Sequence, residues 1–143
     1  QNILLELQKE LHKTIVFITH DLDEALRIGD NIAILRDGKV IQKGDPQDII
    51  MNPADDYIAD FIKDINRSKV IEVRSIMQKG IAKGSSLTSS CSLEDALKTL
   101  NNEKDKQCNV VNEEGKKIGK VTLDAAINAL LREKSVKRSE KYK

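Results

Sequence analysis

The sequence is poor in the residues that mark several specialised classes of protein. Tryptophan is absent from its 143 residues, aromatic residues make up 3% of them, and the two cysteines, Cys91 and Cys108, match no metal-ligand spacing. No apolar run approaches the roughly 20 residues that a membrane-spanning helix needs. The first residues have neither a basic patch before an apolar stretch nor a cleavage site. These shortages argue against an integral membrane protein and a disulfide scaffold, and we expect a soluble chain with reduced thiols.

Charge is nearly balanced over the whole chain but is distributed unevenly along it. Residues 1–65 hold 7 basic and 13 acidic residues, whereas residues 66–143 hold 17 basic and 10 acidic ones. A chain of this length can form one domain or two small ones, and the asymmetry favours two. We expect a first domain in residues 1–66, a second in residues 67–133 and a basic, disordered tail in residues 134–143.

The first thirty residues have the pattern of an α/β layer. Apolar residues at helical spacing predict an amphipathic helix over residues 3–13, and the chain opens inside this pattern with Gln1, so we expect a missing upstream portion. Residues 14–19 (TIVFIT) are β-branched and aromatic without polar alternation, which is typical of a central parallel strand covered on both faces. Asp21 has capping-box spacing and predicts a short helix that ends near Gly29.

The next residues predict a β-hairpin. Two β-prone stretches, 31–36 and 39–43, flank the pair Asp37-Gly38. An Asp-Gly pair readily adopts the positive φ angles of a tight turn, so we expect the two stretches to pair as antiparallel strands.

Two helices are expected after the hairpin. Asp45-Pro46 and Asn52-Pro53 each place a capping side chain before a proline suited to the first helical position. The second helix has an apolar stripe that includes Tyr57 and Phe61. Because helical aromatic residues are more often core residues than ligand contacts, we expect both rings to be buried.

The second half of the chain has its own pattern, which begins after the polar residues 66–69. A short apolar segment and a stretch rich in glycine, serine and threonine come first. The expected order is loop or strand, helix, strand, strand and helix, with the last four elements at 92–100, 107–111, 117–121 and 123–131.

His20 directly follows the predicted buried strand, and this position makes it a candidate for phosphate binding. In open α/β sheets ligands bind outside the carboxyl ends of the strands, and a neutral imidazole can donate one N–H to a phosphate oxygen. The amides of the helix that begins after Asp21 would add a positive field. A strand-end histidine that only satisfies backbone groups explains the same position, and from position alone both interpretations stay open.

The residues around His20 resemble a known family. The segment TIVFITHDLDEALRIGDNIAILRDGKVIQKGDPQDII resembles, almost element by element, the end of an ABC-transporter nucleotide-binding domain, and the resemblance covers essentially residues 1–65. It implies that His20 is the catalytic histidine of the switch loop. In that role His20 contacts the γ-phosphate of ATP and helps to hold the attacking water.

Phosphoryl transfer also needs a phosphate cradle, a lysine and a carboxylate pair for Mg²⁺ and water, and the sequence contains none of them. The nearest match, residues 80–86 (GIAKGSS), is one residue short between its glycines, and Lys83 precedes the second glycine. We reject it as a phosphate loop. The resemblance therefore implies ATP and Mg²⁺ as cofactors, with the Mg²⁺ ligands outside this chain, and we expect the chain alone to be inactive.

Residues 70–133 resemble a CBS module through VRSIM, SLEDALKTL and NVVNEEGKKIGKVTLDAAINALL. The implied fold class is α/β, the C-terminal part of an ABC-type nucleotide-binding domain followed by a small βαββα CBS-like module. In CBS modules that bind adenine nucleotides, an Asp follows a Thr or Ser by three positions. Here Asp124 lies two positions after Thr122, so the two are candidate ligands of the module and, in the alternative interpretation, helix-starting residues.

The two resemblances together imply the ATP-binding subunit of an ABC importer for glycine betaine, proline or related quaternary amines, with a role in osmoprotection. The implied partners are a membrane permease subunit, a second copy of the ATPase subunit as a homodimer and, indirectly, a periplasmic or lipid-anchored substrate-binding protein. Nucleic acid is not expected, because no aromatic residues interleave with the basic ones. The implied location is peripheral, at the cytoplasmic face of the cell membrane. The alternatives are a non-catalytic CBS-domain regulatory protein and an ABC ATPase for another solute.

Overall fold

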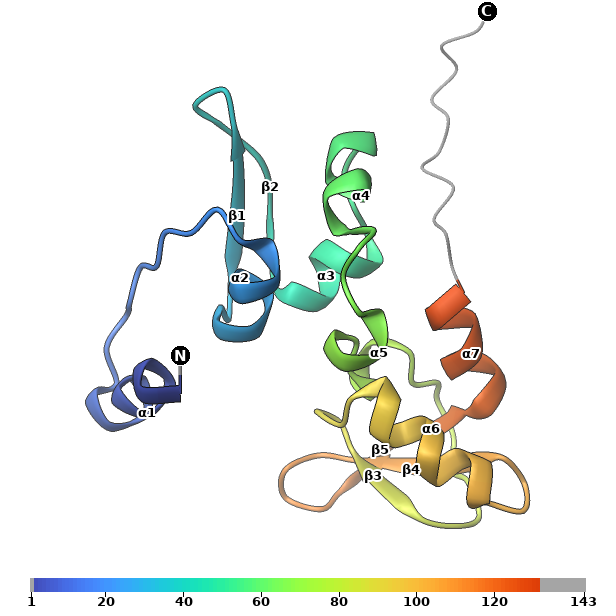
Figure 1. Ribbon diagram of the computed structural model, residues 1–143. Coiled ribbons are helices and arrows are strands. Elements are labelled where there is room, and N and C mark those ends of the chain that lie inside the picture. Colours follow the sequence, from blue (N-terminus) through green and yellow to red (C-terminus); the bar gives the residue numbers. More distant parts are fainter. Residues whose placement is uncertain (1, 132–143) are drawn as a thin grey trace, which may run out of the picture. The chain divides into compact units, whose positions relative to one another are not determined.

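The computed structural model describes residues 2–131, and the chain divides into two compact units, Gln1–Ile65 and Asn66–Lys143 (Figure 1). Both units combine helices with strands, which confirms the predicted α/β class. The basic tail expected at residues 134–143 lies outside the described residues. Within residues 2–131, every helix is too short or too polar to cross a membrane.

The described part of the first unit consists of helices and one hairpin. Its elements are α1 (Asn2–Leu11), α2 (Leu22–Ile28), β1 (Ile32–Arg36), β2 (Lys39–Gly44), α3 (Pro46–Met51) and α4 (Asp56–Ile62). Helix α1 confirms the amphipathic helix predicted near the start of the chain, although none of its residues is buried. Its Gln8 side chain donates a hydrogen bond to the Asp30 carboxylate at 3.2 Å.

The β1–β2 hairpin forms at the predicted Asp-Gly turn. Its strands are antiparallel, and Asp37 and Gly38 have φ angles of +52° and +74°, the positive values that a two-residue type I′ turn requires. Ile32 and Ile34 point to one face of β1 and are buried. Helices contribute the remaining buried apolar residues of this unit: Leu22, Leu26, Ile49, Ile50, Ile58 and Ile62.

Aspartate side chains start three helices of this unit. Asp21, Asp45 and Asp55 each accept a hydrogen bond from the backbone N–H three residues later, at 3.2, 2.8 and 2.9 Å. Each bond satisfies an amide that the first helical turn leaves without an intrahelical partner. The predicted starts of α2 and α3 are therefore confirmed, with Pro46 in the first turn of α3.

Helix α4 begins at Asp56 and not at Pro53, where the Asn-Pro pair predicts a start. Asn52 instead ends α3 as its C-terminal cap. The side chain of Gln42 donates to the Asn52 carbonyl oxygen and accepts from the Ala54 N–H, both at 2.9 Å. These contacts from the hairpin hold the segment as a turn, so the helix starts only after it.

Residues 14–19 do not form the predicted central strand. They belong to no helix or strand, and Val16 and Ile18 are 84% and 91% exposed. A parallel strand forms only where neighbouring strands complete its ladder of hydrogen bonds. The described strands pair elsewhere, β1 with β2 and the others in a separate sheet. The apolar pattern of TIVFIT fits a buried strand, but no described strand pairs with it.

Tyr57 and Phe61 lie on the surface of α4, which contradicts the prediction that they are buried. They are 40% and 45% exposed, and their rings stack with centroids 6.0 Å apart. The Arg36 guanidinium covers the Tyr57 ring at 4.4 Å from its centroid. Ile58 and Ile62 take the buried positions of α4, so the aromatic pair is left on the outer face, where a cation–π contact adds to the stacking.

The second unit contains a three-stranded sheet and two main helices. Its elements are α5 (Arg67–Val70), η1 (Val73–Ser75), β3 (Ser86–Thr88), α6 (Leu93–Asn102), β4 (Gln107–Val111), β5 (Lys117–Thr122) and α7 (Leu123–Leu131). The predicted order is confirmed, and β3 shows that the glycine- and serine-rich stretch contains a strand. The short helices α5 and η1 were not predicted, because three or four residues carry no helical period.

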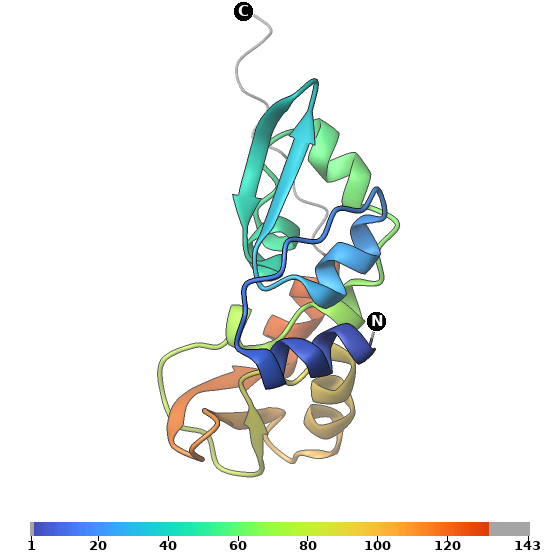
Figure 2. The same ribbon diagram turned by 90° about the vertical axis from the view of Figure 1, so that its left-hand side faces the viewer.

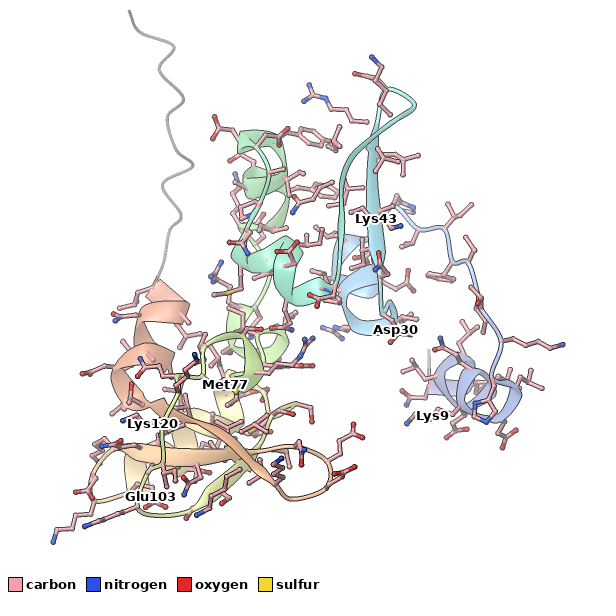
Figure 3. All side chains as sticks on the ribbon, turned by 180° about the vertical axis from the view of Figure 1, so that it is seen from behind. Lys9, Asp30, Lys43, Met77, Glu103 and Lys120 are labelled. Atoms are coloured by element: carbon pink, nitrogen blue, oxygen red, sulfur yellow. The ribbon has the colours of Figure 1, made fainter. Side chains whose placement is uncertain are left out.

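Strand β4 is the centre of this sheet. It pairs with β3 in parallel and with β5 in antiparallel orientation, and α6 and α7 lie on the same side of the sheet (Figure 2). Gln78 and Lys120 of β5 exchange two backbone hydrogen bonds of 2.8 and 2.9 Å. The labels of Met77, the residue before Gln78, and of Lys120 mark this place in Figure 3. Gly119 permits this approach, because a Cβ there would lie 2.7 Å from the Gln78 carbonyl oxygen.

Candidate functional site

His20 stands between the irregular segment 14–19 and helix α2, and its side chain is exposed. The position follows from the sequence on its C-terminal side. Asp21 has extended backbone angles and caps α2, so the chain must turn at the residue before it. The imidazole is thus presented at the start of a helix and not within one.

A short hydrogen-bond network fixes the residues on both sides of His20. The Thr19 hydroxyl accepts from the Asp21 N–H at 3.0 Å and donates to a Glu24 carboxylate oxygen at 2.8 Å. The Glu24 N–H in turn donates to the Asp21 carboxylate. In a simple capping box the glutamate reaches the cap N–H directly; here Thr19 relays the contact. The network holds the backbone around His20 and leaves its ring free of the cap.

The charges near His20 limit what the site can bind. Asp21, Asp23 and Glu24 place three carboxylates at the cap and first turn of α2, and Asp23 forms an ion pair with Arg27 at 2.9 Å. These carboxylates offset the positive end of the helix dipole. The expected helix field is therefore weak, and the imidazole can donate an N–H to an anionic oxygen.

The loop at residues 80–84 is organised for structure and not for phosphate. The Asn109 side chain accepts from the Ala82 N–H and donates to the Ala82 carbonyl oxygen, both at 2.9 Å. A phosphate loop must aim its backbone N–H groups at the ligand, whereas the Ala82 N–H is already bound. The contact supports the rejection of this segment as a phosphate loop.

Thr122 and Asp124 lie where β5 passes into α7. The Thr122 hydroxyl accepts from the Ala125 N–H at 3.1 Å, which is the contact of a helix cap. Asp124 is exposed in the first turn of the same helix. This geometry agrees with the helix-starting interpretation of both residues.

The candidate residues are divided between the two units. His20 belongs to the first unit, and Thr122 and Asp124 belong to the second. Within residues 2–131, no three His, Cys, Asp or Glu side chains gather closely enough to hold a metal ion. The phosphate contact predicted for His20 stays a prediction.

The cysteines are protected thiols. Burial raises the pKa of Cys91, and the nearby Asp95 carboxylate raises it further. Burial also raises the pKa of Cys108, with smaller contributions from Glu103 and Cys91. Because the thiolate is the reactive form, neither cysteine is activated as a nucleophile.

Comparison with known proteins gives close relatives among curated sequences. The chain is 39% identical over 137 residues to the glycine betaine/proline betaine transport system ATP-binding protein ProV of Escherichia coli, which covers 95% of this chain and 34% of that protein. The chain is homologous to ATP-binding proteins of glycine betaine ABC transport systems. Its identity to the glycine betaine/carnitine transport ATP-binding protein GbuA of Listeria monocytogenes is 56% over 77 residues, 54% of this chain and 19% of that protein.

The chain thus spans about a third or less of these relatives. A trimethylamine N-oxide transport system ATP-binding protein of Ruegeria pomeroyi is 36% identical over 92% of this chain and 39% of its own length. Models of known protein families give no match. Among solved structures, the CBS pair domain of a putative Mg²⁺ transporter from Shewanella oneidensis has a TM-score of 0.30 and 19% identity, over 88% of this chain and 58% of that one.

Proposed function

We propose that this chain acts as part of the ATP-binding, ATP-hydrolysing subunit of an ABC importer for glycine betaine, proline or related quaternary amines. One observation carries the proposal: the similarity to the E. coli protein runs through 95% of the chain. It includes the residues around His20 and the second unit in one continuous match. A chain similar to that protein in only one of the two units would not support the same function.

We assign His20 the catalytic role in this subunit. Bound ATP with Mg²⁺ supplies the phosphoryl group whose transfer to water drives transport. An exposed imidazole, held at a fixed backbone position by the Thr19–Asp21–Glu24 network, can donate one N–H to a terminal phosphate oxygen. The other ring nitrogen is then available to orient a water molecule. The Mg²⁺ ligands are assigned to parts of the subunit outside this chain.

The exposed apolar surface of the first unit supports the same proposal. Residues 14–19 leave large apolar side chains open to solvent, and a contiguous apolar surface of this kind marks an interaction site. We assign these residues to a buried strand of the complete nucleotide-binding domain, with neighbouring strands from outside this chain. In that setting His20 follows the carboxyl end of a covered strand, where ligands bind in α/β sheets.

The second unit is assigned a regulatory role. Its strand and helix order matches the βαββα order expected for a CBS-like module. We assign residues 1–66 to the nucleotide-binding domain and residues 67–133 to this module. Thr122 and Asp124 stay its candidate ligands, and the use of the Thr122 hydroxyl as a helix cap argues for a structural role first.

The proposed partners follow from the motor function. They are a membrane permease subunit, a second copy of the ATPase subunit and, indirectly, a substrate-binding protein. The proposed location is the cytoplasmic face of the membrane, as a peripheral subunit. The 143-residue chain by itself should neither bind Mg-ATP tightly nor hydrolyse it, because its described residues provide only the His20 contact.

The test replaces His20 by alanine in the complete ATP-binding subunit. ATP binding should persist, because one of many phosphate contacts is lost, whereas hydrolysis should fall by about 100-fold or more, as for removal of a positioned catalytic group. His12→Asn is the matched control, because His12 is also exposed and its φ of +47° suits asparagine. Turnover at the wild-type rate in His20→Ala would overturn the assignment and favour the non-catalytic regulatory alternative. The alternative of an ABC ATPase for another solute is tested by transport assays, in which the complete importer would then take up that solute and not quaternary amines.

A further inference from the structure

Arg67 joins the first residues of the second unit to the end of its last helix. Its Nε and Nη2 atoms both donate to the Ala129 carbonyl oxygen, at 3.2 and 3.0 Å, across 62 positions of sequence. Ala129 is buried and lies in the last turn of α7. This contact is therefore a partly buried tie between two segments far apart in the chain.

The end of α7 provides a chemical reason for this contact. The last four carbonyl groups of a helix lack intrahelical partners and carry partial negative charge. Helix α7 has no basic residue in its own last turn, and Arg67 supplies a cation from another element. Burial lowers the pKa of Arg67, which marks a partly desolvated cation that depends on this acceptor.

The segment that carries Arg67 is short, and the hydrogen bonds inside it are local: the Ser68 hydroxyl donates to the Asn66 side chain at 2.6 Å, and the Lys69 N–H donates to the Asn66 carbonyl oxygen at 3.1 Å. Helix α5 has only four residues, and its N-cap Asn66 makes no side-chain cap hydrogen bond. Helices this short are not stable alone. The Ile71 N–H donates to the Arg67 carbonyl oxygen, and the Leu93 N–H donates to the Ile71 carbonyl oxygen, both at 2.9 Å. The Arg67 side chain adds to these a contact that reaches 62 positions along the chain, to α7.

The two ends of α7 carry different groups. At its start lies Thr122, whose hydroxyl caps the helix next to the candidate ligand Asp124. At its end lies the carbonyl that holds Arg67. A nine-residue helix spans about 13 Å, and α7 is the element that connects these two groups. A shift at the β5–α7 connection would therefore reach Arg67 through a single element.

We propose that Arg67 is a positioning residue for regulation: it ties residues 66–70, which follow the first unit in the chain, to α7, so that movement of α7 changes this junction. The inference rests on the proposed function, in which the first unit is part of the ATPase and the second is its regulatory module. Arg67 does not touch the nucleotide in this scheme. Its loss should disconnect regulation and leave basal turnover intact.

The experiment uses the complete subunit assembled with its permease, and it measures ATP turnover over a series of KCl concentrations, because residues 66–143 hold 17 basic and 10 acidic residues and salt screens such charges. The variants are Arg67→Gln, Arg67→Lys and a subunit that lacks residues 66–143. Arg74→Gln is the control, because Arg74 is an exposed arginine of η1 that forms an ion pair with Glu72. Arg67→Gln should follow the subunit without the module at every salt concentration, and Arg74→Gln should follow wild type. Arg67→Lys should lie between them, since lysine donates as a point charge and not as a fork.

Two outcomes would overturn the inference: Arg67→Gln that follows wild type, or removal of residues 66–143 without effect on turnover. Absence of turnover in the wild-type assembly would instead refute the proposed function, so the two failures are distinguishable. Hydrogen exchange provides the structural readout. Exchange should rise in residues 66–71 and 126–131 of Arg67→Gln and stay unchanged in β4. A uniform rise over the whole unit would indicate general destabilisation and would also overturn the inference.

Discussion

Replacing Asn109 by alanine should release the loop that its side chain holds. Asn109 is 2% exposed and makes two hydrogen bonds of 2.9 Å to the backbone of Ala82, which is itself 7% exposed. Each hydrogen bond contributes about 1 kcal/mol net, and a buried backbone group left without a partner costs about 1–3 kcal/mol. We therefore expect Asn109→Ala to lower the free energy of unfolding of the second unit by about 2–4 kcal/mol.

Urea unfolding of the 143-residue chain, followed by far-UV circular dichroism, measures this change. With a slope of about 1 kcal/mol per molar urea, the midpoint of the second unit should fall by about 2 M or more. Asn128→Ala is the matched control, because Asn128 is exposed on α7. Hydrogen exchange at residues 80–84 should increase only in the Asn109 variant. Stabilities of the two variants within about 0.5 kcal/mol of each other would refute the reasoning.

Two further predictions concern the glycines and the cysteines. Gly38→Ala should lower the free energy of unfolding by about 1 kcal/mol, from the positive φ alone, because an added Cβ meets nothing within 4 Å. Gly119→Ala should lower it further, because its Cβ would lie 2.7 Å from the Gln78 carbonyl oxygen. Equal melting temperatures of the two variants would contradict this ranking. Cys91 should react with a thiol reagent before the fully buried Cys108, and because both pKa values are raised from 9.0, the Cys91 rate should still increase above pH 9. A faster reaction of Cys108, or a rate plateau below pH 9, would count against the described burial.

Local signals in the sequence were sufficient for the starts of α2 and α3 and for the hairpin. A cap such as Asp21 or Asp45 acts on an amide three residues later, so the whole interaction lies within one short stretch of sequence. The turn at Asp37-Gly38 likewise depends on two residues that tolerate positive φ. The helix start predicted at Asn52-Pro53 was wrong, because contacts from the distant Gln42 side chain hold these residues as a turn.

Features that depend on distant partners could not be predicted in the same way. The TIVFIT pattern at residues 14–19 describes a surface that can be buried, but strand formation requires neighbours that a local pattern does not contain. Tyr57 and Phe61 share the apolar stripe of α4 with Ile58 and Ile62, and only the folded unit shows that the isoleucines take the buried positions while Arg36 of the hairpin covers the Tyr57 ring.

The Asn109 and Arg67 contacts join residues 27 and 62 positions apart. A polar residue in the middle of the strand sequence QCNVV is the one local signal that marks Asn109. For Arg67 the signal is weaker still, since an arginine in a polar linker has many possible roles. Tertiary contacts of this kind depend on the assembled unit.

His20 became a candidate because it directly follows a predicted strand. Its catalytic role came from the resemblance of the surrounding residues to an ABC-transporter nucleotide-binding domain. The structure adds the capping network that fixes its backbone and the carboxylates that weaken the helix field. The assignment of catalysis therefore depends on the imidazole itself and not on a positive helix terminus. This makes the position of the ring the quantity to measure.

The most direct measurement is the distance from the His20 imidazole to the terminal phosphate, in a structure of the complete subunit trapped with ATP and Mg²⁺. We expect a ring nitrogen within hydrogen-bond distance, about 2.7–3.2 Å, of a γ-phosphate oxygen. A ring turned away from the nucleotide, with another residue in contact with the γ-phosphate, would contradict it.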